Sequence, residues 1–293
     1  MSRRARPLVS EGKASAEATM VLARARVLLD EGPLLLASDF DGTLSKLVQD
    51  PWGARIIPRA QRALRRLAAT PGVHVALVSG RTVEDLAERT RVGGISYRGD
   101  HGVQRAEAPR GFRLAALRVD HEPAGATVSR LVAALVQAVP RAIPESWLVV
   151  EDKTVTATFH FRGAPDVAAA RARVLAAVDA VDPDGLLLRS GSSRALELRP
   201  PGASTKGDAL GRLIVERRPA AVIMLGDDHN DALAFDVLRA ERRAARIEGL
   251  AIAVKCHGES STDVVARADV ALPGPAHAAR LLWALASSAA SRR

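Results

Sequence analysis

Two acidic residues that follow a short apolar run are the side chains of this chain best suited to chemistry. Asp39 and Asp41 lie in the pentapeptide Asp-Phe-Asp-Gly-Thr at residues 39–43, which Ser38 separates from the apolar residues 34–37. Such a run predicts a buried strand, and in open α/β sheets ligands bind at the carboxyl ends of the strands. Carboxylate oxygens are ligands that Mg²⁺ prefers, and a carboxylate can also act as a nucleophile toward phosphorus. The pentapeptide therefore indicates phosphoryl transfer.

Further polar motifs occur where strands are predicted to end or helices to begin. They are Ser79, Lys206 and the run 226–231, which contains Asp227, Asp228 and Asp231. The carboxyl ends of parallel strands meet at one edge of a sheet, so we expect these side chains to gather there. Phosphoryl transfer needs a nucleophile, a proton donor, groups that hold phosphate oxygens and carboxylates for a divalent cation. These motifs supply all of them.

Periodicity of apolar residues predicts the elements that must position these motifs. Short apolar runs alternate with helical patterns at the two ends of the chain, which is typical of βαβ units. Strands are predicted over 34–39, 73–78, 95–98, 221–225 and 250–254, and helices over 58–69, 205–217, 230–240 and 276–288. The middle differs, with strand-like runs over 111–119 and 147–161, helical patterns over 124–139 and 165–181, and a hairpin over 186–198.

We therefore predict an α/β fold in which a Rossmann-like parallel-sheet core carries a smaller inserted domain. The core is assigned to residues 31–103 and 200–293, and the inserted α/β cap to residues 104–199. Residues 1–30 are assigned to an N-terminal helical extension.

Composition restricts the class of protein. No apolar run reaches the length of a membrane span, and charged residues interrupt the apolar segment that an export signal would need. The single cysteine, Cys256, excludes an intramolecular disulfide and favours the reducing cytoplasm. The net charge of +9 favours anionic ligands, but only 3% of residues are aromatic and no nucleic-acid motif occurs, so we expect no nucleic-acid partner.

The four motifs resemble those of the haloacid-dehalogenase superfamily of phosphatases. The resemblance implies that Asp39 is the nucleophile, that Asp41 is the general acid and base, and that Ser79 and Lys206 hold the phosphoryl group. It also implies a Mg²⁺ site formed by Asp39, the backbone carbonyl of Asp41 and Asp227. Asp228 and Asp231 are included as metal-site residues, and which of them contacts the ion directly is left open.

A narrower resemblance, over residues 33–236, is to the trehalose-6-phosphate phosphatase family. It rests on Ser79-Gly80-Arg81, on residues 97–102, on Glu151-Asp152-Lys153, on residues 160–162 and on Glu197-Leu198-Arg199-Pro200. The resemblance implies a sugar pocket with Gly80, Arg81, His101, Glu151, Lys153 and Glu197 as substrate-binding residues. The last motif departs from the family pattern at residues 229–232, where His-Asn-Asp-Ala stands.

The resemblance implies a Mg²⁺-dependent phosphatase that hydrolyses trehalose 6-phosphate through an aspartyl-phosphate intermediate. We expect a cytoplasmic protein without a membrane partner, whose oligomeric state is left open with a monomer favoured. A phosphatase for another phosphorylated sugar or glycoside, such as a mannosyl- or glucosyl-glycerate phosphate, is the alternative enzyme. A catalytically silent phosphosugar sensor and a basic nucleic-acid-binding module are the alternatives outside enzymes. Simpler structural roles also stay open: Glu151-Asp152-Lys153 as a polar turn, His101 as a loop histidine, and Glu197 as an exposed strand position.

Overall fold

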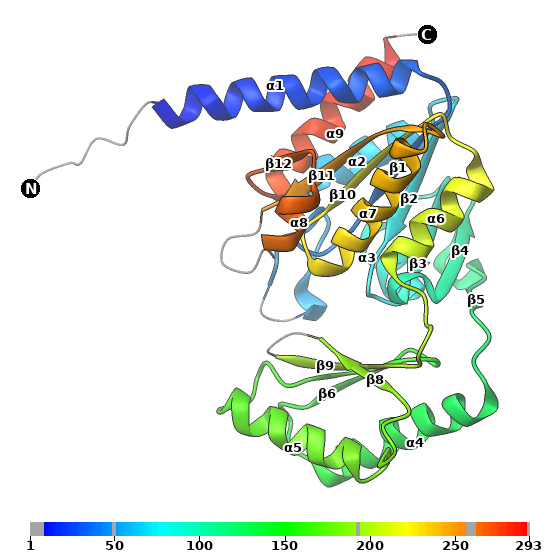
Figure 1. Ribbon diagram of the computed structural model, residues 1–293, viewed down its shortest axis with the longest axis vertical. Helices are drawn as coiled ribbons and strands as arrows, with labels where there is room; N and C mark the ends of the chain where they lie inside the picture. Colours follow the sequence, from blue (N-terminus) through cyan, green and yellow to red (C-terminus); the bar gives the residue numbers. More distant parts are fainter. Residues whose placement is uncertain (1–8, 49–50, 192–193, 256–261, 292–293) are drawn as a thin grey trace, which may run out of the picture. The chain divides into compact units, whose positions relative to one another are not determined.

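The computed structural model of the chain describes residues 9–48, 51–191, 194–255 and 262–291, which form two compact units (Figure 1). The core unit comprises the chain up to Arg118 and from Thr205 onward, and the inserted unit comprises Val119–Ser204. The inserted unit begins later than the predicted boundary at residue 104, because residues 104–108 pair with a strand of the core sheet. It ends at residue 204 rather than 199.

The core unit is built on a sheet whose strands run in the order β12-β11-β10-β1-β2-β3-β4. Its strands are β1 (Leu34–Ser38), β2 (Val73–Val78), β3 (Ile95–Gly99), β4 (Gln104–Ala108), β10 (Ala221–Gly226), β11 (Glu248–Val254) and β12 (Val270–Leu272). All neighbours are parallel except β3 and β4, which form an antiparallel pair. Every residue of the central strands β1 and β10 is buried, as expected for parallel strands covered on both faces.

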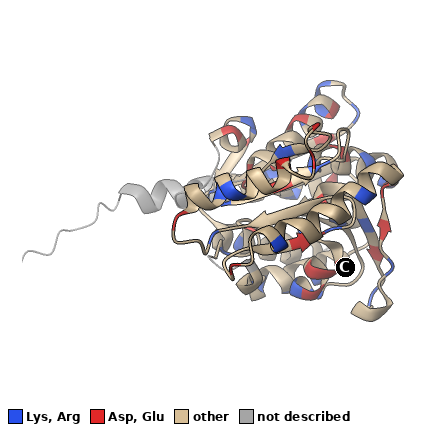
Figure 2. Ribbon diagram, turned by 90° about the horizontal axis from the view of Figure 1, so that it is seen from below, with Lys and Arg blue, Asp and Glu red and all other residues tan. Residues whose placement is uncertain are grey.

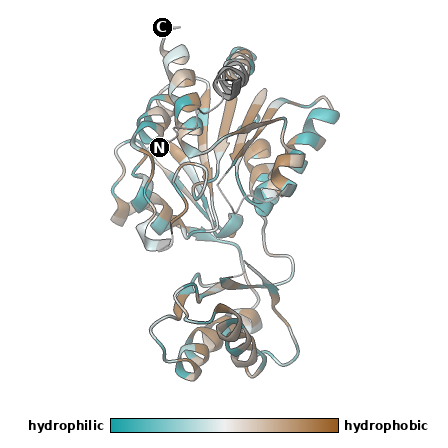
Figure 3. Cartoon of the chain, turned by 90° about the vertical axis from the view of Figure 1, so that its left-hand side faces the viewer, coloured by the Kyte–Doolittle hydropathy of each residue, from teal (hydrophilic) through white to brown (hydrophobic). Residues whose placement is uncertain are grey.

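Helices cover both faces of this sheet (Figure 3). They are α1 (Val9–Asp30), α2 (Pro58–Ala68), α3 (Val83–Thr90), α6 (Lys206–Arg217), α7 (His229–Arg243), α8 (Thr262–Arg267) and α9 (Pro275–Ala290). Helices α6 and α7 pack together over one face, in a cluster with Leu35, Val222 and Phe235, whereas α2 packs against α9. Strands β2 and β3 are added on one side of β1, and strands β11 and β12 are added on the opposite side, beyond β10. The direction in which successive strands are added therefore reverses between β1 and β10.

The N-terminal helix α1 belongs to the core unit rather than standing apart from it. In its described part Val21, Ala25 and Leu28 are buried, a spacing that places them on one face of the helix. The helix contacts α9, β10 and β11.

The inserted unit is a separate antiparallel sheet packed on two helices. Its sheet has the order β6-β7-β9-β8, formed by β6 (Val149–Asp152), β7 (Ala157–His160), β9 (Ala195–Arg199) and β8 (Leu188–Ser190). The helices are α4 (Ala126–Ala142) and α5 (Val167–Asp179), and the two-residue strand β5 (Asp120–His121) precedes them. Phe159 of β7 is buried in one core with Leu135 of α4 and Val174 of α5. Successive side chains of a strand alternate between its two faces, so Thr158 and His160 lie on the face opposite to this core.

The predicted α/β fold with an inserted α/β cap is confirmed, but parts of the prediction were wrong. Residues 111–119 form no strand in the described structure; a single 3₁₀ turn, Leu114–Ala116, lies there instead. Strands β4, β5 and β12 and helix α8 were not predicted from the sequence. Cys256 lies outside the described residues.

Charge and hydropathy agree with the composition. Basic and acidic residues are interspersed along the elements of the chain (Figure 2). No helix in the described ranges combines the length and the apolar character that a membrane span requires.

Candidate active site

The loop after β1 brings Asp39 to the carboxyl end of the sheet and turns sharply behind it. The Asp39 backbone N–H donates to the carbonyl oxygen of Leu225 at 2.9 Å, which continues the β1–β10 pairing by one residue. The backbone N–H groups of Leu44 and Ser45 both donate to the Phe40 carbonyl oxygen, and Phe40 itself is fully buried. The pentapeptide is therefore a tight turn anchored by its aromatic residue.

The structure explains why glycine and threonine occupy the last two positions of the pentapeptide. Gly42 has a φ of +72°, and a Cβ atom there would lie 2.1 Å from a carboxylate oxygen of Asp227. Only glycine satisfies both constraints. The Thr43 hydroxyl donates to Asp227 Oδ1 at 3.0 Å. The first motif thus fixes a carboxylate of the last one, a role of Thr43 that the sequence analysis did not assign.

Lys206 connects these motifs through its ammonium group. It is the first residue of α6, and the Thr205 and Asp208 side chains cap that helix reciprocally. Its Nζ donates to Asp39 Oδ1 and to Asp231 Oδ1, both at 2.8 Å, and the side chain is 2% exposed.

Asp228 and Asp231, which follow β10, make different contacts. Asp228 accepts a hydrogen bond from the Asp231 backbone N–H and so caps α7. Asp231 Oδ2 accepts from the backbone N–H groups of Asp227 and Asp228, while its Oδ1 accepts from Lys206. A Cβ atom at Gly226 would lie 2.3 Å from Asp231, so this turn also requires glycine.

Asp39, Asp227 and Asp231 form a buried acidic cluster. Each offers one carboxylate oxygen, and these oxygens lie within 4.8 Å of one another. Burial, opposed by Lys206, raises the pKa of Asp39 to about 6. Burial and the charge of Asp39 together raise the pKa of Asp227 well above its usual value. Lys206 is the one cation that contacts this cluster among the described residues, so the cluster has more negative than positive charge and suits a divalent cation.

The Asp41 carboxylate does not join the acidic cluster. It is held by Arg81, which donates from Nε to Asp41 Oδ2 at 2.6 Å and from Nη2 to Oδ1 at 2.9 Å. Arg81 also donates to Asp85 of α3 at 2.7 Å. Of the five residues predicted at a metal site, Asp39, Asp227 and Asp231 come together, whereas Asp41 binds Arg81. Asp228 caps α7, and its Oδ1 also lies 3.6 Å from Lys206 Nζ.

Ser79, Gly80 and His101 lie beside one another after β2 and β3. The backbone N–H of His101 donates to the Ser79 carbonyl oxygen at 2.9 Å, and a Cβ atom at Gly80 would lie 2.9 Å from the His101 ring. The Ser79 hydroxyl accepts from the backbone N–H of Arg81 at 3.3 Å. The backbone of His101 has a φ of +58°, so this is a constrained turn and not an ordinary loop.

The candidate sugar-binding residues of the inserted unit share one face of its sheet. Thr158 is the pairing partner of both Glu151 and Glu197, so the side chains of these three residues form a row across three strands. Lys153 is 3% exposed, and its Nζ lies 3.4 Å from Glu197 Oε1. Glu151 Oε2 lies 3.2 Å from His160 Nε2. The structure thus brings Glu151, Lys153 and Glu197 together and adds His160, which the sequence analysis did not include among the site residues.

Comparison with known proteins identifies relatives of this chain. Residues 37–273 match the profile of the family described as Trehalose-phosphatase. The chain is 35% identical over 260 residues to a trehalose-phosphate phosphatase of Mycobacterium avium, an alignment that covers 85% of this chain and 61% of that protein. It is 36% identical over 259 residues to that of Mycobacterium marinum, covering 85% of this chain and 60% of the relative. The chain therefore spans about three fifths of the length of these curated relatives.

Solved structures show the same fold. The C-terminal domain of Candida albicans trehalose-6-phosphate phosphatase superposes with a TM-score of 0.70 at 20% identity, covering 91% of this chain and 97% of that one. At this identity the likeness supports the fold alone.

The pairing of Lys206 with the buried acids predicts the effect of replacing this lysine. Replacement of Lys206 by Met should lower the free energy of unfolding by about 3–5 kcal/mol, because it leaves Asp39 and Asp231 buried without their partner. The measurement is urea unfolding in EDTA-containing buffer. The exposed Lys255 is the matched control, since Lys255→Met should change the unfolding free energy by less than about 0.5 kcal/mol. Equal effects of the two substitutions would contradict the proposed role of Lys206.

Proposed function

Because the chain belongs to the trehalose-phosphatase family, we propose that it is a Mg²⁺-dependent phosphatase that hydrolyses trehalose 6-phosphate to trehalose and phosphate. The observation that carries the proposal is the buried arrangement of Asp39, Lys206, Asp227 and Asp231 at the carboxyl ends of β1 and β10. This edge is where the winding of the sheet reverses, the usual ligand-binding position of such folds.

In the proposed reaction Asp39 is the nucleophile. A carboxylate oxygen of Asp39 bonds to phosphorus while the bond between phosphorus and the sugar oxygen breaks, which produces an aspartyl-phosphate and an alcohol. Water then attacks the same phosphorus and releases inorganic phosphate and the free Asp39 carboxylate. Lys206 orients Asp39 through Oδ1, and its charge also favours the phosphate oxygens.

Asp41 is assigned the proton transfers of both steps. It gives a proton to the departing sugar oxygen in the first step and takes one from the attacking water in the second. In the structure both oxygens of Asp41 bind Arg81, and a third of the side chain is exposed. Proton donation therefore requires that Asp41 exchange at least one of these bonds for the leaving oxygen. Ser79 is assigned to hold a phosphate oxygen through its hydroxyl.

The acidic cluster fits the expected Mg²⁺ ion by the chemistry of its donors. Asp39 and Asp227 supply hard carboxylate oxygens, and the raised pKa of Asp227 reflects burial and negative charge that nearby protein groups do not fully offset. We assign the ion to Asp39, Asp227 and the backbone carbonyl of Asp41, with Asp231 orienting Lys206. When bound, Mg²⁺ would neutralise phosphate charge and act as a Lewis acid on the phosphoryl group.

The sugar is assigned to polar residues of both units. Glu151, Glu197 and Lys153 can bond hydroxyl groups from the row on the inserted sheet. Gly80, Arg81 and His101 are the assigned sugar-binding residues of the core unit. Carboxylates accept hydrogen bonds from sugar hydroxyls, and an ammonium group donates to sugar or phosphate oxygens.

The nucleophile assignment predicts the behaviour of Asp39→Asn. Phosphate release from trehalose 6-phosphate should fall by more than about 10³-fold, because an amide oxygen is a far weaker nucleophile than a carboxylate. Circular dichroism and thermal unfolding of the same preparation serve as the control for folding. A folded variant that keeps a few per cent or more of the activity would rule out Asp39 as the nucleophile.

The metal assignment predicts two effects of Mg²⁺. Activity should be lost after dialysis against EDTA and return with added Mg²⁺. Independently of activity, Mg²⁺ at 100 times its dissociation constant should stabilise the metal-free protein by about 2.7 kcal/mol, and this stabilisation should be largely absent in Asp227→Asn. Full activity in metal-free buffer, or equal stabilisation of the variant, would refute the assignment.

The sugar assignment predicts that substitutions in the inserted unit depend on the substrate. Glu151→Gln and Lys153→Met should each lower kcat/KM for trehalose 6-phosphate about 10–100-fold, the effect of losing a charge-assisted hydrogen bond. The same variants should change kcat/KM for p-nitrophenyl phosphate little, because this ester has no sugar.

The matched control for these variants is Glu145→Gln. Glu145 pairs with Arg173 in the inserted unit and lies outside the row, so its substitution should affect neither substrate. Equal losses on both substrates in the Glu151 and Lys153 variants would assign those residues to folding or to the chemical step. A panel of other phosphosugars, including glycosyl-glycerate phosphates, distinguishes trehalose 6-phosphate from the alternative substrates.

A further inference from the structure

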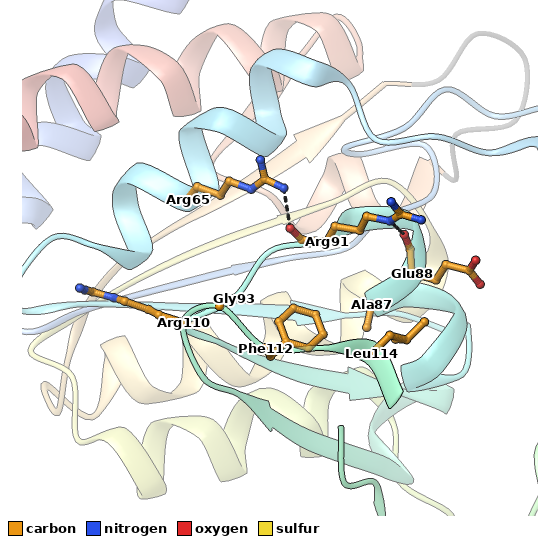
Figure 4. Close-up of a pocket in the computed structure, with 9 residues that line it drawn as sticks. Arg65, Ala87, Glu88, Arg91, Gly93, Arg110, Phe112 and Leu114 are labelled. Carbon is orange, nitrogen blue, oxygen red and sulfur yellow. Dashed lines mark hydrogen bonds between the residues drawn. The ribbon is translucent and has the colours of Figure 1, made fainter. Parts of the chain in front are cut away.

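The core unit contains an open cavity of about 480 Å³ away from the candidate active site (Figure 4). Arg91 and Gly93 line it from the segment between α3 and β3, and Arg110 lines it from the segment after β4. These segments lie at the amino end of β3. Asp39 and Asp227 follow the carboxyl ends of β1 and β10, which run parallel through the same sheet. The cavity and the active site are therefore at opposite edges of the sheet.

Three arginines at this cavity have guanidinium groups that no carboxylate of the described residues neutralises. Arg65 donates to the Arg91 carbonyl oxygen at 2.7 Å, Arg110 donates to the Ala68 carbonyl oxygen at 3.0 Å, and Arg91 donates to the Glu88 carbonyl oxygen at 3.3 Å. Within the described ranges none of the three forms an ion pair with an acidic side chain, unlike the arginines that hold Asp41 or Asp269. Each guanidinium group has further N–H donors beyond the one that binds its carbonyl oxygen.

The charge at the cavity favours a dianion. The residues that line the cavity include three arginines and one acid, Glu88, so their formal charges sum to +2. A phosphate monoester carries close to two negative charges at neutral pH, and guanidinium groups bind phosphate oxygens through paired N–H donors.

One wall of the cavity is apolar and flat. Phe112 is half-buried, and its ring is tilted at 57° to the Tyr97 ring with centroids 6.3 Å apart. A Cβ atom at Gly93 would lie 2.6 Å from the Pro109 carbonyl oxygen and 3.2 Å from the Phe112 ring, so glycine lets this loop pack closely. Leu114 extends the apolar surface beside Phe112. A planar ring can stack on this wall while its anionic group meets the arginines.

We propose that this cavity binds a small phosphate monoester that carries a planar ring, the chemistry of a mononucleotide. Its volume is within the range of small-molecule sites. Arg65 and Arg91, which lie next to each other in Figure 4, bind the phosphate, and Phe112 and Leu114 contact the ring. The site is separate from the proposed phosphatase reaction and does not depend on it.

The test is isothermal titration calorimetry of the full chain with AMP as the probe. The expected result is saturable binding of AMP, with adenosine and inorganic phosphate each at least about tenfold weaker because each lacks one of the two recognised groups. Arg65→Gln, Arg91→Gln and Phe112→Ala should each weaken AMP binding about tenfold, the loss of roughly 1.4 kcal/mol. Arg65→Lys should weaken it less than Arg65→Gln, because the charge is kept.

Control variants distinguish this cavity from other anion sites. Arg59→Gln changes an exposed arginine of the same helix that does not line the cavity, and it should leave AMP binding unchanged. Lys206→Met tests whether AMP binds at the candidate active site instead. AMP binding that is lost in Lys206→Met but unchanged in Arg65→Gln and Arg91→Gln would overturn the proposal. Absence of saturable AMP binding at low-millimolar concentrations would also overturn it.

Discussion

The buried contact of Lys206 with Asp39 and Asp231 is the interaction on which the active-site architecture depends. These residues belong to three separate segments, and burial of their charges is acceptable only if the segments meet with close geometry. The loops after β1 and β10 are also joined directly. The Thr43 hydroxyl donates to Asp227, and a side chain at Gly42 would clash with the Asp227 carboxylate. The ion pairs of Lys206 and the close contact of the two loops therefore both favour the same relative position of the loops after β1 and β10.

The sheet topology explains why such a cluster forms between β1 and β10. The two strands are neighbours in space but distant in sequence, and the helices that follow them lie on opposite faces of the sheet. Their loops therefore diverge and leave the edge between them open, where polar groups can gather. A sheet wound in one direction only would place a helix across this position.

The buried acidic cluster was easier to predict from the sequence than the edge strands of the fold. Asp39 and Asp227 each come at the end of a predominantly apolar run that predicted a buried strand. Strand β4 was missed because its buried residues are one glutamine and two alanines, which lack the β-branched or aromatic character of a typical strand. Residues 111–119 were predicted as strand-like from composition, but that segment forms no pairing in the described structure. Neither the arginine-lined cavity nor the pairing of Asp41 with Arg81 has a local sequence signal, because both depend on segments brought together by the fold.

Helix α3 determines the environment of the proposed general acid from a distance. Arg81 contacts Asp41 directly, but its position is also set by Asp85, which binds Arg89 one turn further along the helix. Arg89 in turn donates to two backbone carbonyl oxygens of residues 52–54, in the segment that follows the first motif. Asp41 is therefore held by the chain of ion pairs Asp41–Arg81–Asp85–Arg89. Hydrogen bonds from Arg89 connect this chain back to residues 52–54, close to Asp41 in the sequence. Asp39, the proposed nucleophile, and Lys206 are not members of this chain of contacts, since Asp39 binds Leu225 of β10 and Lys206 begins α6. The proposed nucleophile and the proposed proton donor are thus held by different contacts of the core unit: Asp39 by Leu225 and Lys206, and Asp41 by Arg81.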